Sequence, residues 1–168
     1  MKGKVLLSSL LFTAVAGIMI SGCDPAKKWE KQEQDTIDSY LNSLGGDTVY
    51  TKKTSGLYYL DLVIGTGAQP AVNDTVSIKY KGSFLTGTEF ATNYTDTSKF
   101  SFVVGGGGAL QGLDEGVRYM KEGGKAKMLI PSALAYGTYG AYNGYVNIPG
   151  YTPLIFEVIL VKVKKVSK

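Results

Sequence analysis

The hydrophobic and polar positions of this chain follow two different periods, and the change comes near residue 56. Before it, large apolar side chains recur at helical spacing among Lys, Glu, Gln and Asp residues: Ile37, Tyr40, Leu41 and Leu44. Gly45 and Gly46 then supply a stop. The pattern predicts a helix within residues 24–47. We expect it to act as a spacer, although docking on the following domain or dimerisation would use the same apolar face.

From Gly56 onward, apolar and polar residues alternate as they do in half-buried β-strands. The clearest alternation places Val76, Ile78 and Tyr80 on one face, with polar residues between them. The same reasoning predicts five strands, over residues 57–64, 76–81, 100–104, 125–130 and 154–163. Strands of this kind, separated by turns, predict an antiparallel sheet.

One stretch in the middle of the domain returns to helical spacing. Four glycines at 105–108 lead into a segment with a periodic apolar face: Leu110, Leu113, Val117 and Met120. Asp114 and Glu115 stand in its first turn, where acidic residues interact favourably with the helix dipole, and Gly123-Gly124 provides an end. We therefore predict an α+β domain in which about five antiparallel strands wrap around one short helix.

The first 23 residues have the pattern of an export signal. Lys2 and Lys4 precede an apolar run from Val5 to Ile20, which ends in Ile20-Ser21-Gly22-Cys23. This ending resembles a bacterial lipobox, in which the cysteine is acylated and becomes the mature N-terminus. An ordinary signal peptide with an incidental cysteine is the alternative.

The predicted organisation has three parts: a signal peptide over residues 1–22, a lipidated Cys23 with a helical spacer over 23–47, and a domain over 48–168. Two or three acyl chains would hold the protein durably on a membrane, because each buried methylene contributes ~0.8 kcal/mol. We expect a lipoprotein of the bacterial cell envelope, membrane-anchored and extracytoplasmic. Trp29 lies near the anchor and is expected to rest at the lipid interface.

Charge and composition narrow the chemistry. The chain has 18 Lys and Arg residues against 14 Asp and Glu, a net charge of +4, which is too little and too dispersed to indicate a nucleic-acid partner. It contains no histidine and one cysteine, so His-based triads and the usual zinc sites are excluded. Leu113 stands where a phosphate-binding loop requires lysine after the glycines. The sequence therefore predicts activity without a metal or a cofactor.

Five segments, in this order, carry a resemblance to a known family: Tyr80-Lys81-Gly82, Phe100-Ser101-Phe102, the glycine run with the helix after it, Ala135-Tyr136-Gly137, and Ile148-Pro149 with the strand through Phe156. Over about residues 55–164 the chain resembles an FKBP-type peptidyl-prolyl cis-trans isomerase. The resemblance implies an FKBP-like fold. It also implies an apolar pocket that binds proline-containing segments of unfolded or exported polypeptides, and it suggests macrolide ligands as further partners.

The resemblance assigns the pocket residue by residue. The catalytic positions fall on Tyr136, Leu110 and Phe90, where the Tyr136 hydroxyl and the backbone N–H of Leu110 each bind a substrate carbonyl. The substrate-binding positions fall on Tyr80, Phe100, Ala109, Leu113, Ile148 and Phe156. Simple core packing remains the alternative for each aromatic residue, most of all for Phe100 and Phe102, because strand alternation alone explains them.

The chain departs from the family pattern in several places. Ala91 and, approximately, Asp96 stand where the family commonly pairs an aspartate with an arginine, and Leu113 replaces a frequent tryptophan. The loop after Gly140 is longer than in the smallest members and carries Tyr142 and Tyr145. A catalytically weak chaperone or peptide-binding lipoprotein is therefore an alternative to the isomerase, and a glycan-binding module built on the loop tyrosines is a third reading.

Overall fold

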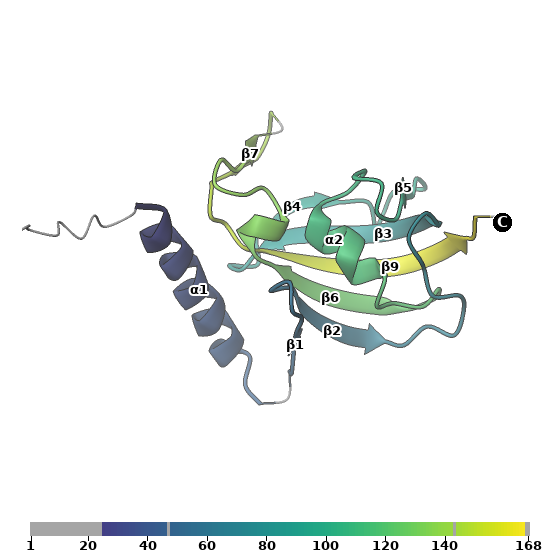
Figure 1. The fold of residues 1–168 in the computed structure, drawn as a ribbon, viewed down its shortest axis with the longest axis horizontal. Helices are drawn as coiled ribbons and strands as arrows, with labels where there is room; N and C mark the ends of the chain where they lie inside the picture. Colours follow the sequence, from purple (N-terminus) through teal and green to yellow (C-terminus); the bar gives the residue numbers. More distant parts are fainter. Residues whose placement is uncertain (1–24, 47, 143, 167–168) are drawn as a thin grey trace, which may run out of the picture.

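The computed structural model describes residues 25–46, 48–142 and 144–166 (Figure 1). The predicted signal peptide and Cys23 lie outside the described residues. Within the described ranges, none of the helices combines the length and the apolar character needed to span a bilayer.

An antiparallel sheet of seven strands forms the body of the domain, in the order β1-β2-β6-β9-β3-β4, and β5 pairs with β3. A separate two-stranded hairpin pairs β7 with β8. The strands are β1 (Thr51–Lys52), β2 (Tyr58–Val63), β3 (Thr75–Phe84), β4 (Glu89–Thr92), β5 (Phe100–Val103), β6 (Lys125–Ile130), β7 (Ala141–Tyr142), β8 (Asn147–Ile148) and β9 (Leu154–Lys164). The prediction of an α+β domain is confirmed, and β1, β4, β7 and β8 are additions to the five predicted strands.

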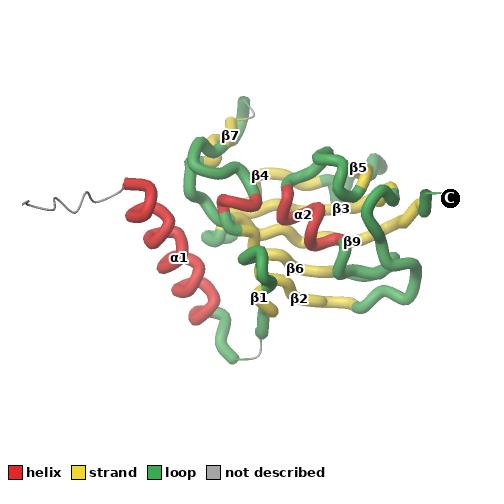
Figure 2. Tube along the Cα trace, viewed as in Figure 1, coloured by secondary structure: helices red, strands yellow, loops and turns green. Residues whose placement is uncertain are grey.

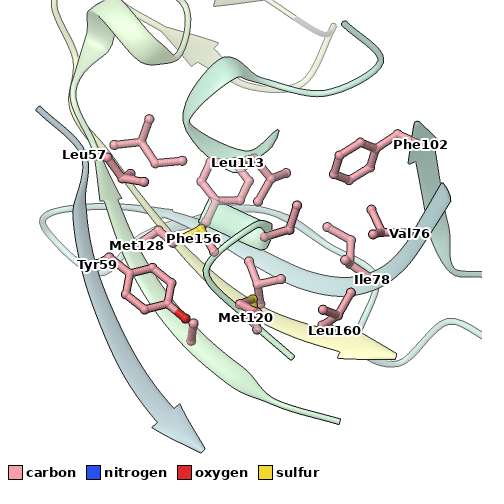
Figure 3. Close-up of a cluster of buried hydrophobic side chains, with 14 of the residues drawn as sticks. Leu57, Tyr59, Val76, Ile78, Phe102, Leu113, Met120, Met128, Phe156 and Leu160 are labelled. Atoms are coloured by element: carbon pink, nitrogen blue, oxygen red, sulfur yellow. The ribbon is translucent and has the colours of Figure 1, made fainter. Parts of the chain in front are cut away.

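The main core fills the face of the sheet that carries the second helix, α2 (Gln111–Val117). The alternation of β3 buries Val76 and Ile78 completely. Their cross-strand neighbours on β9, Val163 and Leu160, lie in the same core (Figure 3). The long central strands β3 and β9 therefore contribute much of this core.

The helix α2 packs very closely on β6. A Cβ atom on Gly112 would lie 2.4 Å from Cγ2 of Ile130, and one on Gly116 would lie 2.3 Å from Sδ of Met128. Only glycine allows this approach. The helix ends at Val117, earlier than the predicted end at Gly123-Gly124, because the chain continues in tight i to i+3 turns.

The first helix, α1 (Pro25–Ser43), docks on the other face of the sheet, at the ends of β2 and β6. Ile37 is 1% exposed and packs on Tyr58 and Leu129, which face each other across these strands. Figure 2 shows α1 at one end of the sheet beside β1, well apart from α2. Of the three arrangements open to this helix, the structure has docking on the domain.

Burial on both faces explains the runs of consecutive buried residues in the sheet. In β6, Met128 and Ile130 belong to the core under α2, whereas Leu129 between them packs under α1. A strand covered on both faces loses the alternation of a half-buried strand. The apolar run of β6 is thus a direct consequence of two helices on opposite faces.

Candidate functional site

An open cleft of about 330 Å³ lies between the start of α2, the strands β3, β4, β5 and β9, and the turn after β6. Its lining is almost entirely apolar or aromatic and comes from six separate segments: Tyr80, Phe90, Ala91, Phe100, Gly107, Gly108, Ala109, Leu110, Leu113, Tyr136 and Phe156. A cleft of this kind suits an apolar ligand with few polar groups.

The aromatic wall of the cleft is a connected set of rings. Tyr80 meets Phe100 edge to face with ring centroids 5.9 Å apart, and it lies at the same distance from Phe156. Phe90 packs on the other side of Phe156, at 5.8 Å and an interplanar angle of 75°. Such edge-to-face contacts hold aromatic rings in defined orientations, so the cleft has a pre-formed shape.

Gly82 explains why the Tyr80-Lys81-Gly82 motif accompanies this wall. It pairs with Ala91 on β4 and with Phe156 on β9. A Cβ atom at this position would lie 2.7 Å from Cζ of Phe90 and 3.3 Å from Cε1 of Phe156. Glycine therefore leaves the space that the Phe90 ring occupies beside Phe156.

The start of α2 supplies the base of the cleft and one hydrogen-bond donor, the backbone N–H of Leu110. Leu113 is 3% exposed and closes the base of the cleft. Leu110 precedes the helix with extended backbone angles, and its carbonyl oxygen accepts hydrogen bonds from the N–H groups of Leu113 and Asp114. In the described part of the chain, no protein acceptor takes the N–H of Leu110. A donor is thus available at the cleft edge.

Tyr136 supplies a second donor. It follows the short 3-10 helix η1 (Ser132–Leu134), and the chain turns immediately after it at Gly137, where φ is +63°. Burial raises the pKa of its hydroxyl, and the neighbouring Tyr80 adds to the rise. The hydroxyl is therefore neutral at physiological pH and able to donate a hydrogen bond into the cleft.

The structure gathers eight of the nine predicted pocket residues around the cleft: Tyr80, Phe90, Phe100, Ala109, Leu110, Leu113, Tyr136 and Phe156. The ninth, Ile148 on β8, is 5% exposed and belongs to the main core, and it is not among the residues that line the cleft. Phe100 lines the cleft, whereas Phe102 is buried in the core. Ala91, expected at the pocket edge, lines the cleft as well, and the residues that sequence reasoning did not place there are Gly107 and Gly108, which have no side chain to signal a role.

Ala91 and Asp96 have separate surroundings. Ala91 lies on β4 and lines the cleft. The carboxylate of Asp96 accepts hydrogen bonds from the backbone N–H and the hydroxyl of Ser98, at 3.0 and 2.5 Å, and these bonds lower its pKa. The side chain of Asp96 is thus engaged in a local turn.

The hairpin β7–β8 projects from the domain next to the turn that carries Tyr136 (Figure 1). Tyr139 and Tyr145 are 98% and 96% exposed, and Tyr142 is largely exposed as well. The base of the hairpin is held by close backbone contact, since a Cβ atom on Gly140 would lie 2.0 Å from the Ile148 carbonyl oxygen.

No group of three or more His, Cys, Asp or Glu side chains is placed to hold a metal ion within the described ranges. The groups that the cleft offers to a ligand are aromatic rings, aliphatic side chains and two hydrogen-bond donors. Such a site is built to bind an apolar chain segment that carries carbonyl oxygens.

Comparison with known proteins agrees with this geometry. Residues 67–161 match the family of FKBP-type peptidyl-prolyl cis-trans isomerases, which covers most of the sheet and the whole of α2. The chain therefore belongs to the FKBP-type family, and its fold is FKBP-like.

Individual relatives cover more of the chain than the family match does. The FKBP-type peptidyl-prolyl cis-trans isomerase FkpA of Escherichia coli K12 is 34% identical over 144 residues, which is 82% of this chain and 51% of the relative. The chain thus spans about half the length of the curated relatives it matches.

Two solved structures show the same fold. The crystal structure of FkpA from Escherichia coli aligns with a TM-score of 0.68 at 32% identity, over 83% of this chain and 63% of that one. A peptidyl-prolyl cis-trans isomerase from Pseudomonas syringae also gives a TM-score of 0.68, at 27% identity, over 84% of this chain and 98% of that one.

Proposed function

We propose that this protein is a peptidyl-prolyl cis-trans isomerase that binds X-Pro segments of other polypeptides in the aromatic cleft. The observation that carries the proposal is the pairing of an aromatic, apolar cleft with two donors, the Tyr136 hydroxyl and the Leu110 N–H. Membership of the FKBP-type family supports the same activity.

The physical basis is the electronic structure of the amide. Rotation about the prolyl bond faces a barrier of ~18 to 20 kcal/mol, because resonance gives the bond partial double-bond character. In the twisted transition state this resonance is lost and the amide becomes less dipolar. An apolar, water-poor cleft therefore favours the twisted amide over the planar one. No nucleophile or general base is needed.

The residues divide this work between them. Phe90, Tyr80 and Phe156 surround the proline and exclude water from the amide. The Tyr136 hydroxyl and the Leu110 N–H hold substrate carbonyl oxygens on either side of that ring. Donors placed in advance fix the peptide without paying for reorganisation during the reaction.

A specific observation favours a second function. Ala91 gives the cleft an apolar wall where the family commonly has an aspartate, so the site binds apolar segments without that polar group. A chaperone or peptide-binding lipoprotein with little turnover would use the same cleft.

The test is an exchange measurement on the purified full chain. Two-dimensional NMR exchange spectroscopy on a Leu-Pro tetrapeptide, with the protein at catalytic concentration, measures cis–trans exchange directly. We expect exchange to accelerate above the uncatalysed rate. Saturable binding of the peptide with no acceleration would overturn the isomerase and leave the binding protein. Neither binding nor acceleration would overturn both.

We propose further that the protein works outside the cytoplasm as a lipoprotein anchored through Cys23, where it assists the folding of exported polypeptides. Residues 1–23 support this with their basic start, apolar run and lipobox-like ending. The Cys23→Ser variant should be folded but released from membranes into the soluble fraction. Retention of that variant on membranes after a salt wash would contradict the lipid anchor.

A further inference from the structure

One stripe of α1 faces the domain. Trp29, Glu33 and Ile37 follow each other at intervals of four residues, so they lie on one side of the helix. Ile37 anchors the helix to the sheet at Tyr58 and Leu129. The other two residues reach the segment that carries Tyr136, although that segment is about a hundred positions away along the chain.

Glu33 makes the polar contact. Its carboxylate accepts two hydrogen bonds from Ser132, one from the backbone N–H at 2.5 Å and one from the hydroxyl at 2.6 Å. Ser132 is 4% exposed and is the first residue of η1. Hydrogen bonds donated to a charged acceptor are roughly twice as strong as those between neutral groups, so this is a firm attachment between α1 and the turn after β6.

Ser132 is also hydrogen-bonded to both neighbours of Tyr136. Its carbonyl oxygen accepts from the N–H of Ala135 at 2.9 Å and from the N–H of Gly137 at 2.8 Å. Tyr136 lies between these two donors, and its own carbonyl oxygen accepts from Gly140. A shift of Ser132 must therefore move the backbone on either side of the tyrosine.

Trp29 contacts the segment around Tyr136 through a second residue, Tyr151. Its ring stacks on Tyr151, with centroids 6.2 Å apart and an interplanar angle of 21°. The N–H of Tyr151 donates to the carbonyl oxygen of Gly137 at 3.0 Å. Two contacts from one helix, a single turn apart, thus converge on the residue that follows Tyr136.

We infer that Glu33 is a positioning residue of the isomerase site, which acts through Ser132 to aim the Tyr136 hydroxyl into the cleft. This inference rests on the proposed function. The helix outside the family match, residues 25–43, is then part of the working site. A substrate-binding donor that is misplaced by less than an ångström loses much of its value, because hydrogen bonds depend steeply on distance and angle.

The test compares three variants of the full chain with the unmodified protein. Glu33→Ala removes both acceptors. Glu33→Gln keeps the shape, since its amide oxygen accepts from the Ser132 N–H and its amide nitrogen donates to the Ser132 hydroxyl. Glu30→Ala is the matched control, because Glu30 is an exposed carboxylate one turn away on the same helix.

We expect Glu33→Ala to lower kcat/KM for the Leu-Pro peptide by roughly 3- to 10-fold, which is within what the loss of one hydrogen bond can cost. Glu33→Gln should restore most of the activity, and Glu30→Ala should have none of this effect. In a Tyr136→Phe background, which lacks the hydroxyl, Glu33→Ala should cost little more. Equal losses in both backgrounds would show that Glu33 does not act through Tyr136, and would overturn the inference.

Amide hydrogen exchange gives a reading that does not depend on activity. Glu33→Ala should accelerate exchange at Ala135 and Gly137 while Met128, in the core strand β6, keeps its protection. Unchanged exchange at Ala135 and Gly137, or faster exchange throughout the core, would also overturn the inference. An inactive unmodified protein would instead overturn the proposed function, and the exchange result would still decide whether Glu33 holds this turn.

Discussion

The two helices of this domain pack on opposite faces of one sheet by different means. The helix α2 contributes Leu113 and Val117 to a large apolar core and approaches β6 through Gly112 and Gly116. The helix α1 buries one large aliphatic residue completely, Ile37, and adds hydrogen bonds and a ring contact around it. The helix α2 is thus inseparable from the main core, whereas α1 is attached to a sheet that already has that core.

The two sides of the sheet also differ in their relation to the cleft. The face under α2 forms the cleft, where rigid apolar packing sets the shape. The attachment of α1 includes polar contacts, in which Ser132 donates hydrogen bonds to Glu33 and Gln34 donates one to Tyr58. Polar contacts can be weakened one at a time without leaving a cavity in the main core, so α1 is the part of the molecule whose attachment is open to variation.

The largest effect should follow from a change on the α2 side. Phe156 is 3% exposed and touches both the core and the cleft. Phe156→Ala should lower the free energy of unfolding by ~3 to 5 kcal/mol, because it removes a buried aromatic ring and leaves a cavity. Chemical denaturation followed by circular dichroism measures this. A free energy of unfolding equal to that of the unmodified protein would show that this ring does not support the fold.

Ile37→Ala tests the other face and should have a smaller effect. We expect a loss of ~2 kcal/mol, at the low end for a buried aliphatic residue, because only a small cluster surrounds this side chain. The loss should appear as faster amide exchange in α1, with protection retained in β6 at Met128 and Ile130. Loss of protection in α1 and in β6 together would mean that the two faces unfold as one unit.

The smallest expected effect is on stability at low pH, through the carboxyl group of Glu157. Burial of Glu157 alone would raise its pKa, but Lys125, Tyr94 and Lys81 outweigh it and hold the pKa below its usual range. A lowered pKa in the folded state contributes stability above the unfolded value of about 4.3, and this stability is lost as the pH falls through the folded value. Glu157→Gln should therefore flatten the decline in stability below about pH 4.3. An unchanged acid profile from urea titrations between pH 3 and 6 would rule out this contribution.

The elements that were predictable from the sequence are those long enough to show a period. The strand over 125–130 was placed at its observed bounds, and the others were placed within a few residues, because each repeats an apolar pattern several times. The strands β1, β7 and β8 have two residues each, too few for a period to exist. The predicted helix ran too far because Met120 keeps its apolar, buried position in turns that follow α2.

Some residues of the site were likewise predictable from the sequence, and others were not. The aromatic positions of the cleft follow from the motifs that resemble the family, and the structure brings them together. The location of Ile148 in the core does not follow, since it depends on how β8 pairs with β7. The contact between Glu33 and Ser132 had no sequence signal at all, because an amphipathic helix indicates that something covers it without indicating what.

We propose that the cleft isomerises prolyl bonds and that the Tyr136 hydroxyl binds the substrate there. The most direct test measures kcat/KM for a Leu-Pro peptide by NMR exchange, for the unmodified chain and for Tyr136→Phe. We predict catalysis by the unmodified chain and a loss of ~0.5 to 1.5 kcal/mol of transition-state stabilisation in the variant, the worth of one hydrogen bond, with an unchanged melting temperature. Catalysis unaffected by the variant, or no catalysis by the unmodified chain, would contradict the account.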